Sequence, residues 1–230
     1  MALGFDTVLF DLDGTLLNTI EDLAAAVNYV LEKYSEPQRS IDEIRCFVGN
    51  GIRRLMIRAV PGGEENPTFE QQFTDFSTYY LCHDRVRTKP YEGILKLLEE
   101  CRERGIQTAI VSNKYQAATE DLRAYYFADL IPVAVGAGEG RRTKPAPDAP
   151  MEALKRLDAM ANPAEAPKKS RRVLYVGDSD VDAQTAANSK MDCALVSWGF
   201  RDRGLLQQQT AVAVCDNPAE LLGVIIGEPV

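Results

Sequence analysis

Short apolar runs rich in β-branched residues recur along the chain of 230 residues, and polar or glycine-containing segments follow each of them. They predict buried strands at residues 8–10, 106–111, 132–135, 173–176, 193–196 and 211–214. Most of the intervening segments carry apolar residues at helical spacing, as in residues 93–105, where a glycine stops the pattern. Continuous apolar strands that alternate with helices indicate a parallel sheet covered on both faces. We therefore expect an α/β fold with a three-layer, Rossmann-like core, whose functional site lies beyond the carboxyl ends of its strands.

One long segment interrupts this alternation. Residues 18–88 have a helical pattern and contain no good candidate for a buried strand. Amphipathic helices are predicted at residues 21–34, 51–60 and 69–82, with prolines and glycines between the last two. We expect this segment to be a helical domain inserted after the first strand, while residues 1–17 and 89–230 form the core. A second irregular segment, residues 161–172, predicts an exposed loop before the fourth strand.

Composition limits the partners that the protein can have. The chain has 26 Lys and Arg residues against 34 Asp and Glu residues, which gives a net charge of -8. An acidic protein of this kind is expected to bind neither nucleic acid nor an anionic membrane surface. No run approaches the roughly twenty apolar residues that span a bilayer. The N-terminus also lacks the basic and apolar regions of a signal peptide, so we expect a cytoplasmic protein. We expect it to be a monomer or a homodimer.

The cysteines agree with a reducing compartment. They are odd in number, scattered and without a CxxC pair: Cys46, Cys82, Cys101, Cys193 and Cys215. With a single histidine, His83, the chain lacks a histidine–cysteine set for zinc. We expect free thiols, most of them buried.

The segment Asp11-Leu12-Asp13-Gly14-Thr15 follows directly on the first predicted strand. Residues i and i+2 of an extended strand point to the same side, so Asp11 and Asp13 can face one site. Two carboxylates so close together are unfavourable unless a cation lies between them or one of them keeps its proton. The motif therefore indicates chemistry rather than an ordinary surface turn.

Polar side chains follow three other predicted strands: Ser112 and Asn113, then Lys144, then Asp178, Ser179 and Asp182. Taken singly, each has a structural explanation. A lone serine is often a helix N-cap, a loop lysine is usually solvated, and acidic residues complement the dipole at the start of a helix. Together they place a hydroxyl, an ammonium group and carboxylates at one edge of the sheet, because the carboxyl ends of parallel strands meet there.

This set of groups suits phosphoryl transfer. Asp11, Asp13 and Asp178 offer the hard oxygen ligands that Mg²⁺ prefers. Mg²⁺ and Lys144 would neutralise charge on the transferring group, while Ser112 and backbone amides would hold its other oxygens. One aspartate can act as nucleophile and give an aspartyl-phosphate that water hydrolyses, while the second serves as acid and base.

These motifs, in this order, closely resemble those of the haloacid dehalogenase superfamily of phosphatases, and the resemblance covers nearly the whole chain. It implies that Asp11 is the nucleophile and that Asp13 is the acid/base, which also offers its backbone carbonyl to Mg²⁺. The remaining matches are the hydroxyl of the second motif (Ser112), the lysine of the third (Lys144), the metal-binding aspartate (Asp178) and the supporting residues Ser179 and Asp182. The inserted segment resembles the family's helical cap of the first type, a lid that excludes water and helps to choose the substrate.

Within the superfamily, residues 47–51 and the helix after them resemble the cap of phosphoglycolate phosphatase-like enzymes. This resemblance implies a small phosphorylated metabolite as substrate, with 2-phosphoglycolate as the best single candidate. The residues expected to contact it, besides the catalytic set, are Asn113, Gly49, Asn50 and Gly51. Asp13 argues against the dehalogenase and phosphonate-cleaving branches of the superfamily, because both lack this acid.

Several alternatives stay open. The sequence does not decide whether Arg53, Arg54 or Arg58, on the polar side of a predicted cap helix, contacts the substrate. An inorganic pyrophosphatase, a nucleotide or sugar-phosphate phosphatase, or a β-phosphoglucomutase-like phosphotransferase would use the same core residues. A non-catalytic binding module on this fold predicts loss of the nucleophile or the lysine, whereas Asp11 and Lys144 are both present.

Overall fold

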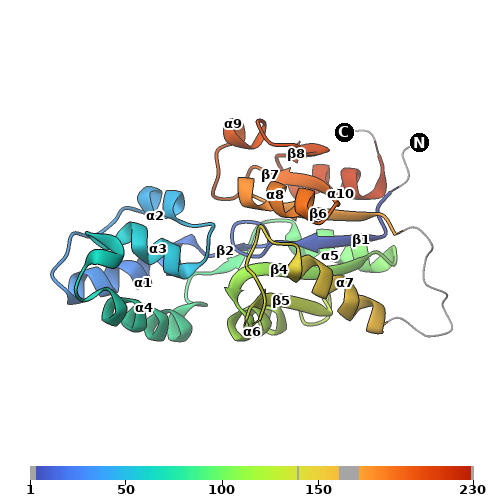
Figure 1. Cartoon of the computed structure of the whole chain (residues 1–230). Helices are drawn as coiled ribbons and strands as arrows, with labels where there is room; N and C mark the ends of the chain where they lie inside the picture. The colour runs from blue at the N-terminus through green and yellow to red at the C-terminus, as the bar shows by residue number, and fades with distance from the viewer. Residues whose placement is uncertain (1–3, 139, 161–170, 229–230) are drawn as a thin grey trace. The chain divides into compact units, whose positions relative to one another are not determined.

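The computed structural model describes residues 4–138, 140–160 and 171–228. The chain divides into two compact units (Figure 1). Met1–Leu16 and Pro90–Val230 form the first, the core unit, and Leu17–Lys89 forms the second, the helical unit. Of the loop expected at residues 161–172, residues 161–170 lie outside the described part of the chain.

Parallel strands form the main sheet of the core unit. Their spatial order is β5-β4-β1-β6-β7-β8, and every neighbouring pair in the sheet runs parallel. The bounds are β1 (Thr7–Phe10), β4 (Gln107–Tyr115), β5 (Val133–Ala137), β6 (Val173–Gly177), β7 (Asp192–Val196) and β8 (Ala213–Cys215). Chain order therefore reverses at β1, between β4 and β6, and ligands bind beyond the carboxyl ends of strands at such a reversal. The expected α/β, Rossmann-like core is confirmed, and each predicted strand overlaps an observed one.

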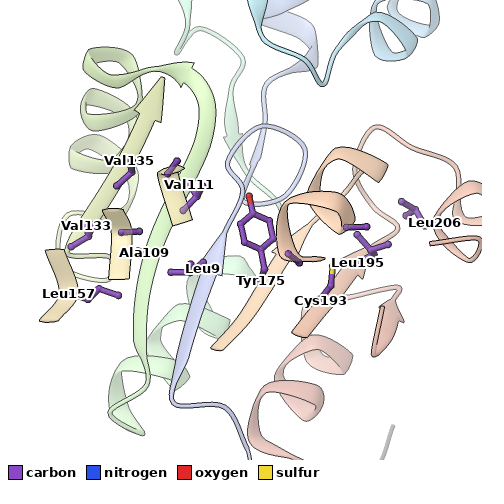
Figure 2. Close-up of a cluster of buried hydrophobic side chains, with 14 residues drawn as sticks. Leu9, Ala109, Val111, Val133, Val135, Leu157, Tyr175, Cys193, Leu195 and Leu206 are labelled. Carbon is purple, nitrogen blue, oxygen red and sulfur yellow. The ribbon is translucent and has the colours of Figure 1, made fainter. Parts of the chain in front are cut away.

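Helices cover both faces of this sheet (Figure 1). On one face α7 (Asp148–Met160), α8 (Asp180–Asn188) and α9 (Arg203–Leu206) pack against the strands. On the other are α5 (Ile94–Glu103) and α6 (Gln116–Phe127), which lie in crossovers of one hand, and α10 (Pro218–Ile226), which follows β8 and packs beside α5. Figure 2 shows Leu9, Val111, Tyr175 and Leu195 of adjacent strands in one buried cluster under α7 and α8. Burial of each large apolar side chain stabilises the sheet by about 1.5–3 kcal/mol.

The helical unit contains α1 (Ile20–Lys33), α2 (Ile41–Phe47), α3 (Ile52–Ala59), a 3₁₀ turn (Gly63–Glu65) and α4 (Phe69–His83). Three of these helices lie where helices are expected. The sequence analysis missed α2, which begins at a capping box: the Ser40 hydroxyl accepts from the Glu43 N–H at 3.2 Å, and the Ser40 N–H donates to the Glu43 carboxylate at 2.8 Å. The short strands β2 (Leu17–Asn18) and β3 (Lys89–Pro90) pair where the chain passes between the two units. In the described part of the chain, helices are too short or too polar to cross a membrane.

Candidate active site

Asp11 is the first residue after β1 and is buried. Its backbone N–H donates to the Val176 carbonyl at 2.8 Å, which continues the pairing of β1 with β6. One carboxylate oxygen, Oδ1, lies 2.7 Å from Lys144 Nζ. Burial raises the pKa of Asp11 well above its usual range; Lys144 opposes this effect, while Asp182 and Asp178 add to it. Lys144 thus holds the carboxylate in one orientation, while burial disfavours its ionised form.

Lys144 is the central cation of the site, and its side chain is only 4% exposed. Its Nζ also lies 2.8 Å from Asp182 Oδ1. Burial alone would lower the pKa of Lys144, but the carboxylates of Asp11 and Asp182 raise it above its usual value, so the group stays charged. The Asn113 carboxamide fixes the backbone of this lysine: it accepts from Lys144 N at 2.7 Å and donates to Lys144 O at 3.3 Å. A contact between Asn113 and a substrate stays a prediction.

Asp182 anchors the lysine from α8 and is fully buried. Its Oδ1 accepts from Lys144 and, at 3.4 Å, from the Tyr175 hydroxyl, while its Oδ2 accepts from the Ser179 hydroxyl at 2.5 Å. The backbone at Gly177 passes so close that an added Cβ would lie 2.5 Å from Asp182 Oδ2. Tyr175 was not expected at the site, since in the sequence it is one more apolar position of a buried strand (Figure 2).

Asp178 follows β6 and lies between two glycines. A Cβ on Gly14, whose φ is +90°, would lie 2.8 Å from Asp178 Cγ, and a Cβ on Gly199 would meet the same carboxylate from another side. The Phe200 N–H donates to Asp178 Oδ2 at 2.6 Å. Burial, and next the charge of Asp182, raise the pKa of Asp178 to about 7. A side chain at either glycine would therefore collide with this carboxylate.

Carboxylate oxygens of Asp11, Asp178 and Asp182 lie within 4.8 Å of one another. Oxygen-only donor sets of this kind suit hard divalent cations. Burial first, and neighbouring carboxylates next, raise the pKa values of Asp11 and Asp178, so their ionised forms are disfavoured without a further cation. A bound divalent cation would supply that charge, so the residues fit a metal site. The cluster contains Asp182 rather than the Asp13 side chain, and a backbone contribution from Asp13 stays a prediction.

Asp13 reaches the same edge of the sheet with its side chain 18% exposed. Its Oδ1 is buried and accepts no hydrogen bond from the described residues. Lys114 Nζ lies 3.5 Å from this oxygen, and the Lys114 N–H donates to the Ser112 hydroxyl at 3.2 Å. The Ser112 hydroxyl therefore keeps its proton for donation to an anion. The sequence analysis missed Lys114; the signal was its place two residues after Ser112, where an extended strand turns both side chains to one side.

In the helical unit, the three residues expected to contact substrate form the loop between α2 and α3. Gly49 and Gly51 have φ values of +127° and +82°, conformations that glycine adopts readily. Arg58 of α3 donates to the Phe47 carbonyl at 2.6 Å and to Asn50 Oδ1 at 3.1 Å, so its side chain holds the loop in shape. Contact of this loop with a substrate stays a prediction.

Arg53 is engaged inside the helical unit. Its guanidinium pairs with Glu70 at 2.5 Å and with Glu64 at 3.2 Å. It also lies over the rings of Phe69 and Phe73, at 5.1 and 5.2 Å from their centroids. Through these contacts Arg53 packs α3 against α4 and the 3₁₀ turn.

Comparison with known proteins places the chain in a family. The sequence profile of the haloacid dehalogenase-like hydrolases matches residues 8–196. The phosphoglycolate phosphatase of Cereibacter sphaeroides is 34% identical over 198 residues, which cover 84% of this chain and 86% of that protein. The Aquifex aeolicus phosphoglycolate phosphatase is 30% identical over 200 residues, covering 84% and 85% of the two chains. A crystal structure from Lactobacillus delbrueckii subsp. bulgaricus, of a protein provisionally described as a phosphoglycolate phosphatase, has a TM-score of 0.89 at 31% identity and covers 98% of this chain and 100% of its own. The chain therefore belongs to the haloacid dehalogenase-like hydrolase family.

Proposed function

We propose that the protein is a Mg²⁺-dependent phosphatase that hydrolyses a small phosphomonoester through an aspartyl-phosphate on Asp11, with 2-phosphoglycolate as the leading substrate. The observation that carries the proposal is the buried contact of Asp11 with Lys144, beside the carboxylates of Asp178 and Asp182. Membership of a hydrolase family supports the reaction class. The names of the relatives support the choice of substrate.

The chemistry begins at Asp11. Lys144 holds Oδ1 of this carboxylate, which fixes its direction, and the carboxylate attacks the phosphorus atom. The bond from phosphorus to the ester oxygen breaks, and Asp13 gives its proton to the leaving alkoxide. Asp13 then takes a proton from water, which attacks the phosphoryl group, releases inorganic phosphate and restores Asp11. The Lys144 ammonium group and the Ser112 hydroxyl would stabilise charge on the phosphoryl oxygens during both steps.

The residues proposed to hold Mg²⁺ are Asp11 and Asp178, with the Asp13 backbone carbonyl and support from Asp182. When bound, Mg²⁺ would neutralise charge on the transferring group and favour the ionised form of the nucleophile. Ser179 would act through Asp182, whose Oδ2 it holds at 2.5 Å.

We propose further that residues 18–88 form a cap and that the loop of Gly49, Asn50 and Gly51 meets the substrate. The compactness of the helical unit and the bracing of its loop by Arg58 support this role. The acidic composition and the free cysteines support a cytoplasmic enzyme that binds neither nucleic acid nor membrane, as a monomer or homodimer.

Phosphate release from a substrate panel tests this function. The panel contains 2-phosphoglycolate, pyrophosphate, nucleoside monophosphates and hexose phosphates, each with Mg²⁺ and with EDTA. We expect Mg²⁺-dependent release with kcat/KM of about 10⁴ M⁻¹s⁻¹ or more for 2-phosphoglycolate and far less for the others. Preference for another compound would name one of the alternative phosphatases, and isomerised sugar phosphate would reveal a mutase. No release from any compound would contradict the proposal.

A further inference from the structure

We propose that Asn113 is a positioning residue for Lys144: its carboxamide holds the backbone of the lysine and, through it, the ammonium group beside the nucleophile Asp11. The inference rests on the proposed phosphatase function and deepens it. It assigns to Asn113 a role in catalysis that passes through Lys144 rather than through contact with the substrate.

Both ends of the Asn113 carboxamide face one residue. Its Oδ1 accepts from the Lys144 N–H at 2.7 Å, and its Nδ2 donates to the Lys144 carbonyl at 3.3 Å. A carboxamide carries an acceptor and a donor side by side, so it can pair with both backbone groups of one residue. This pair ties the lysine to β4, the strand that also carries Ser112.

The backbone of Lys144 depends on such a partner because of its place in the fold. Lys144 is buried and belongs to the connection between β5 and α7, outside the helices and strands. Buried backbone N–H and C=O groups are paired in folded proteins, and a residue outside regular structure must find its partners among side chains, turns or water. Asn113 pairs with both groups, so it sets the point from which the lysine side chain extends.

The far end of this side chain shows why that point matters. Lys144 Nζ lies 2.7 Å from Asp11 Oδ1 and 2.8 Å from Asp182 Oδ1, and the two carboxylates come from different elements, the end of β1 and α8. A lysine has a flexible stem of four carbons, which can reach one point in several arrangements. A fixed backbone restricts these arrangements. The ammonium group is then held where it orients Asp11 for attack on phosphorus.

A neighbouring contact supports the same connection without Asn113. Asn188 of α8 donates from Nδ2 to the Pro145 carbonyl at 2.8 Å. This contact uses neither the N–H nor the carbonyl of Lys144. Removal of the Asn113 carboxamide should therefore loosen the lysine without unfolding the connection.

A double-mutant cycle with Lys144→Met tests the inference. With the best substrate of the panel, we expect Asn113→Ala to lower kcat by about 10- to 100-fold, since a displacement of about 1 Å at a catalytic group can cost about 10²-fold in rate. KM should change by less than about threefold. In the Lys144→Met background, Asn113→Ala should lower kcat by less than about threefold, because no ammonium group remains to be positioned. A residue that contacts the substrate, or that only supports the fold, would have the same effect in both backgrounds.

Asn28→Ala is the matched control. The Asn28 carboxamide makes the same pair of contacts with the backbone of Arg39 in the helical unit, both at 2.8 Å. Loss of this pair should lower Tm, as Asn113→Ala does, but leave kcat within about threefold of the wild type. The comparison separates the positioning of Lys144 from the general cost of losing two hydrogen bonds.

An equal loss of kcat in both backgrounds, or an unchanged kcat in Asn113→Ala, would overturn the inference. Should Asn113→Ala not fold, Asn113→Asp takes its place in the cycle under the same two criteria. Its carboxylate still accepts from the Lys144 N–H but has no donor for the Lys144 carbonyl.

Hydrogen exchange gives an answer that does not depend on turnover, for the case that Lys144→Met is too slow to measure. Asn113→Ala should speed exchange of the Lys144 amide at least about tenfold. Exchange of the Ala146 amide, which donates to the Thr143 carbonyl at 3.0 Å, should stay unchanged. Unchanged exchange at Lys144 would overturn the inference. Failure of the proposed function looks different, because the wild type would then release no phosphate while the Lys144 amide still responded to Asn113→Ala.

Discussion

The substitution Gly199→Ala tests how closely the backbone packs around Asp178, a proposed Mg²⁺ ligand. A Cβ built on this residue would lie 2.5 Å from the Gly14 carbonyl oxygen and closer still to Cβ and Oδ2 of Asp178. Side-chain carbons essentially never approach other heavy atoms within 3.0 Å, so Asp178 or the backbone must shift. Overpacking of this kind costs about 1–3 kcal/mol of stability. At about 2–4 °C per kcal/mol for a chain of this length, Gly199→Ala should lower Tm by about 2–12 °C.

The effect on activity should exceed the effect on stability. A displacement of about 1 Å at a catalytic group can cost about 10²-fold in rate. We expect Gly199→Ala to lower kcat/KM by about that factor and to raise the Mg²⁺ concentration needed for half-maximal activity, because Asp178 is a proposed ligand. Thermal unfolding and a Mg²⁺ titration of phosphate release measure the two effects.

Gly204→Ala is the matched control for this substitution. An added Cβ there has no heavy atom within 4 Å, and Gly204 lies in α9. This substitution should leave activity unchanged and raise stability by about 0.4–1 kcal/mol, because it restricts the unfolded chain. If Gly199→Ala instead kept wild-type activity, Mg²⁺ dependence and Tm, the reasoning that Gly199 fixes Asp178 would be refuted.

Three further predictions follow from other parts of the molecule. Treatment with EDTA should abolish phosphate release and Mg²⁺ should restore it; unchanged activity after metal removal would contradict the metal assignment. Because the pKa of Asp178 rises from its usual 3.8 to about 7 on folding, the metal-free folded state binds the extra proton between these values. The stability of the metal-free wild type relative to Asp178→Asn should therefore fall as pH rises from about 4 to about 7, and a rise measured by urea unfolding would show the sign to be wrong. Ser40→Ala should remove the capping box of α2 and cost about 1 kcal/mol, and an unchanged unfolding free energy would show that this cap contributes nothing.

Much of the core could be predicted because the sequence patterns that indicate its strands and helices each lie within a short segment of the chain. Strands buried on both faces are continuous apolar runs, and the polar residues that end them lie at one edge whenever the strands are parallel. The sequence alone therefore predicts that Asp11, Lys144 and Asp178 share one site. Family resemblance added their roles, which spacing alone does not supply. The helix α2 could also have been predicted, because Ser40 and Glu43 have the spacing of a capping box; the sequence analysis overlooked this pattern.

Some residues of the site were not predicted, or make a contact other than the predicted one, because their positions depend on three-dimensional packing. Tyr175 occupies an apolar strand position, and only the packing of α8 brings Asp182 to its hydroxyl. Lys114 lies two residues after Ser112 in β4, so alternation could have placed both side chains on one side, but its burial beside Asp13 depends on the packing of β4 against the segment that follows β1. Asn113 holds the Lys144 backbone across a separation of 31 residues. Sequence periodicity carries no information on such contacts.

The central claim, that Asp11 is the nucleophile of a Mg²⁺-dependent phosphatase, is tested most directly by the turnover of Asp11→Asn. Asp180→Asn is the matched control, since Asp180 is exposed and its nearest ion pair, with Arg201, is 3.8 Å long. With Mg²⁺ and the best substrate of the panel, we predict that Asp11→Asn loses at least about 10⁴-fold in kcat while keeping its fold, because a carboxamide at this position cannot form the acyl phosphate. The control should keep wild-type turnover. Near-normal turnover of Asp11→Asn, in a preparation free of contaminating phosphatase, would contradict the account.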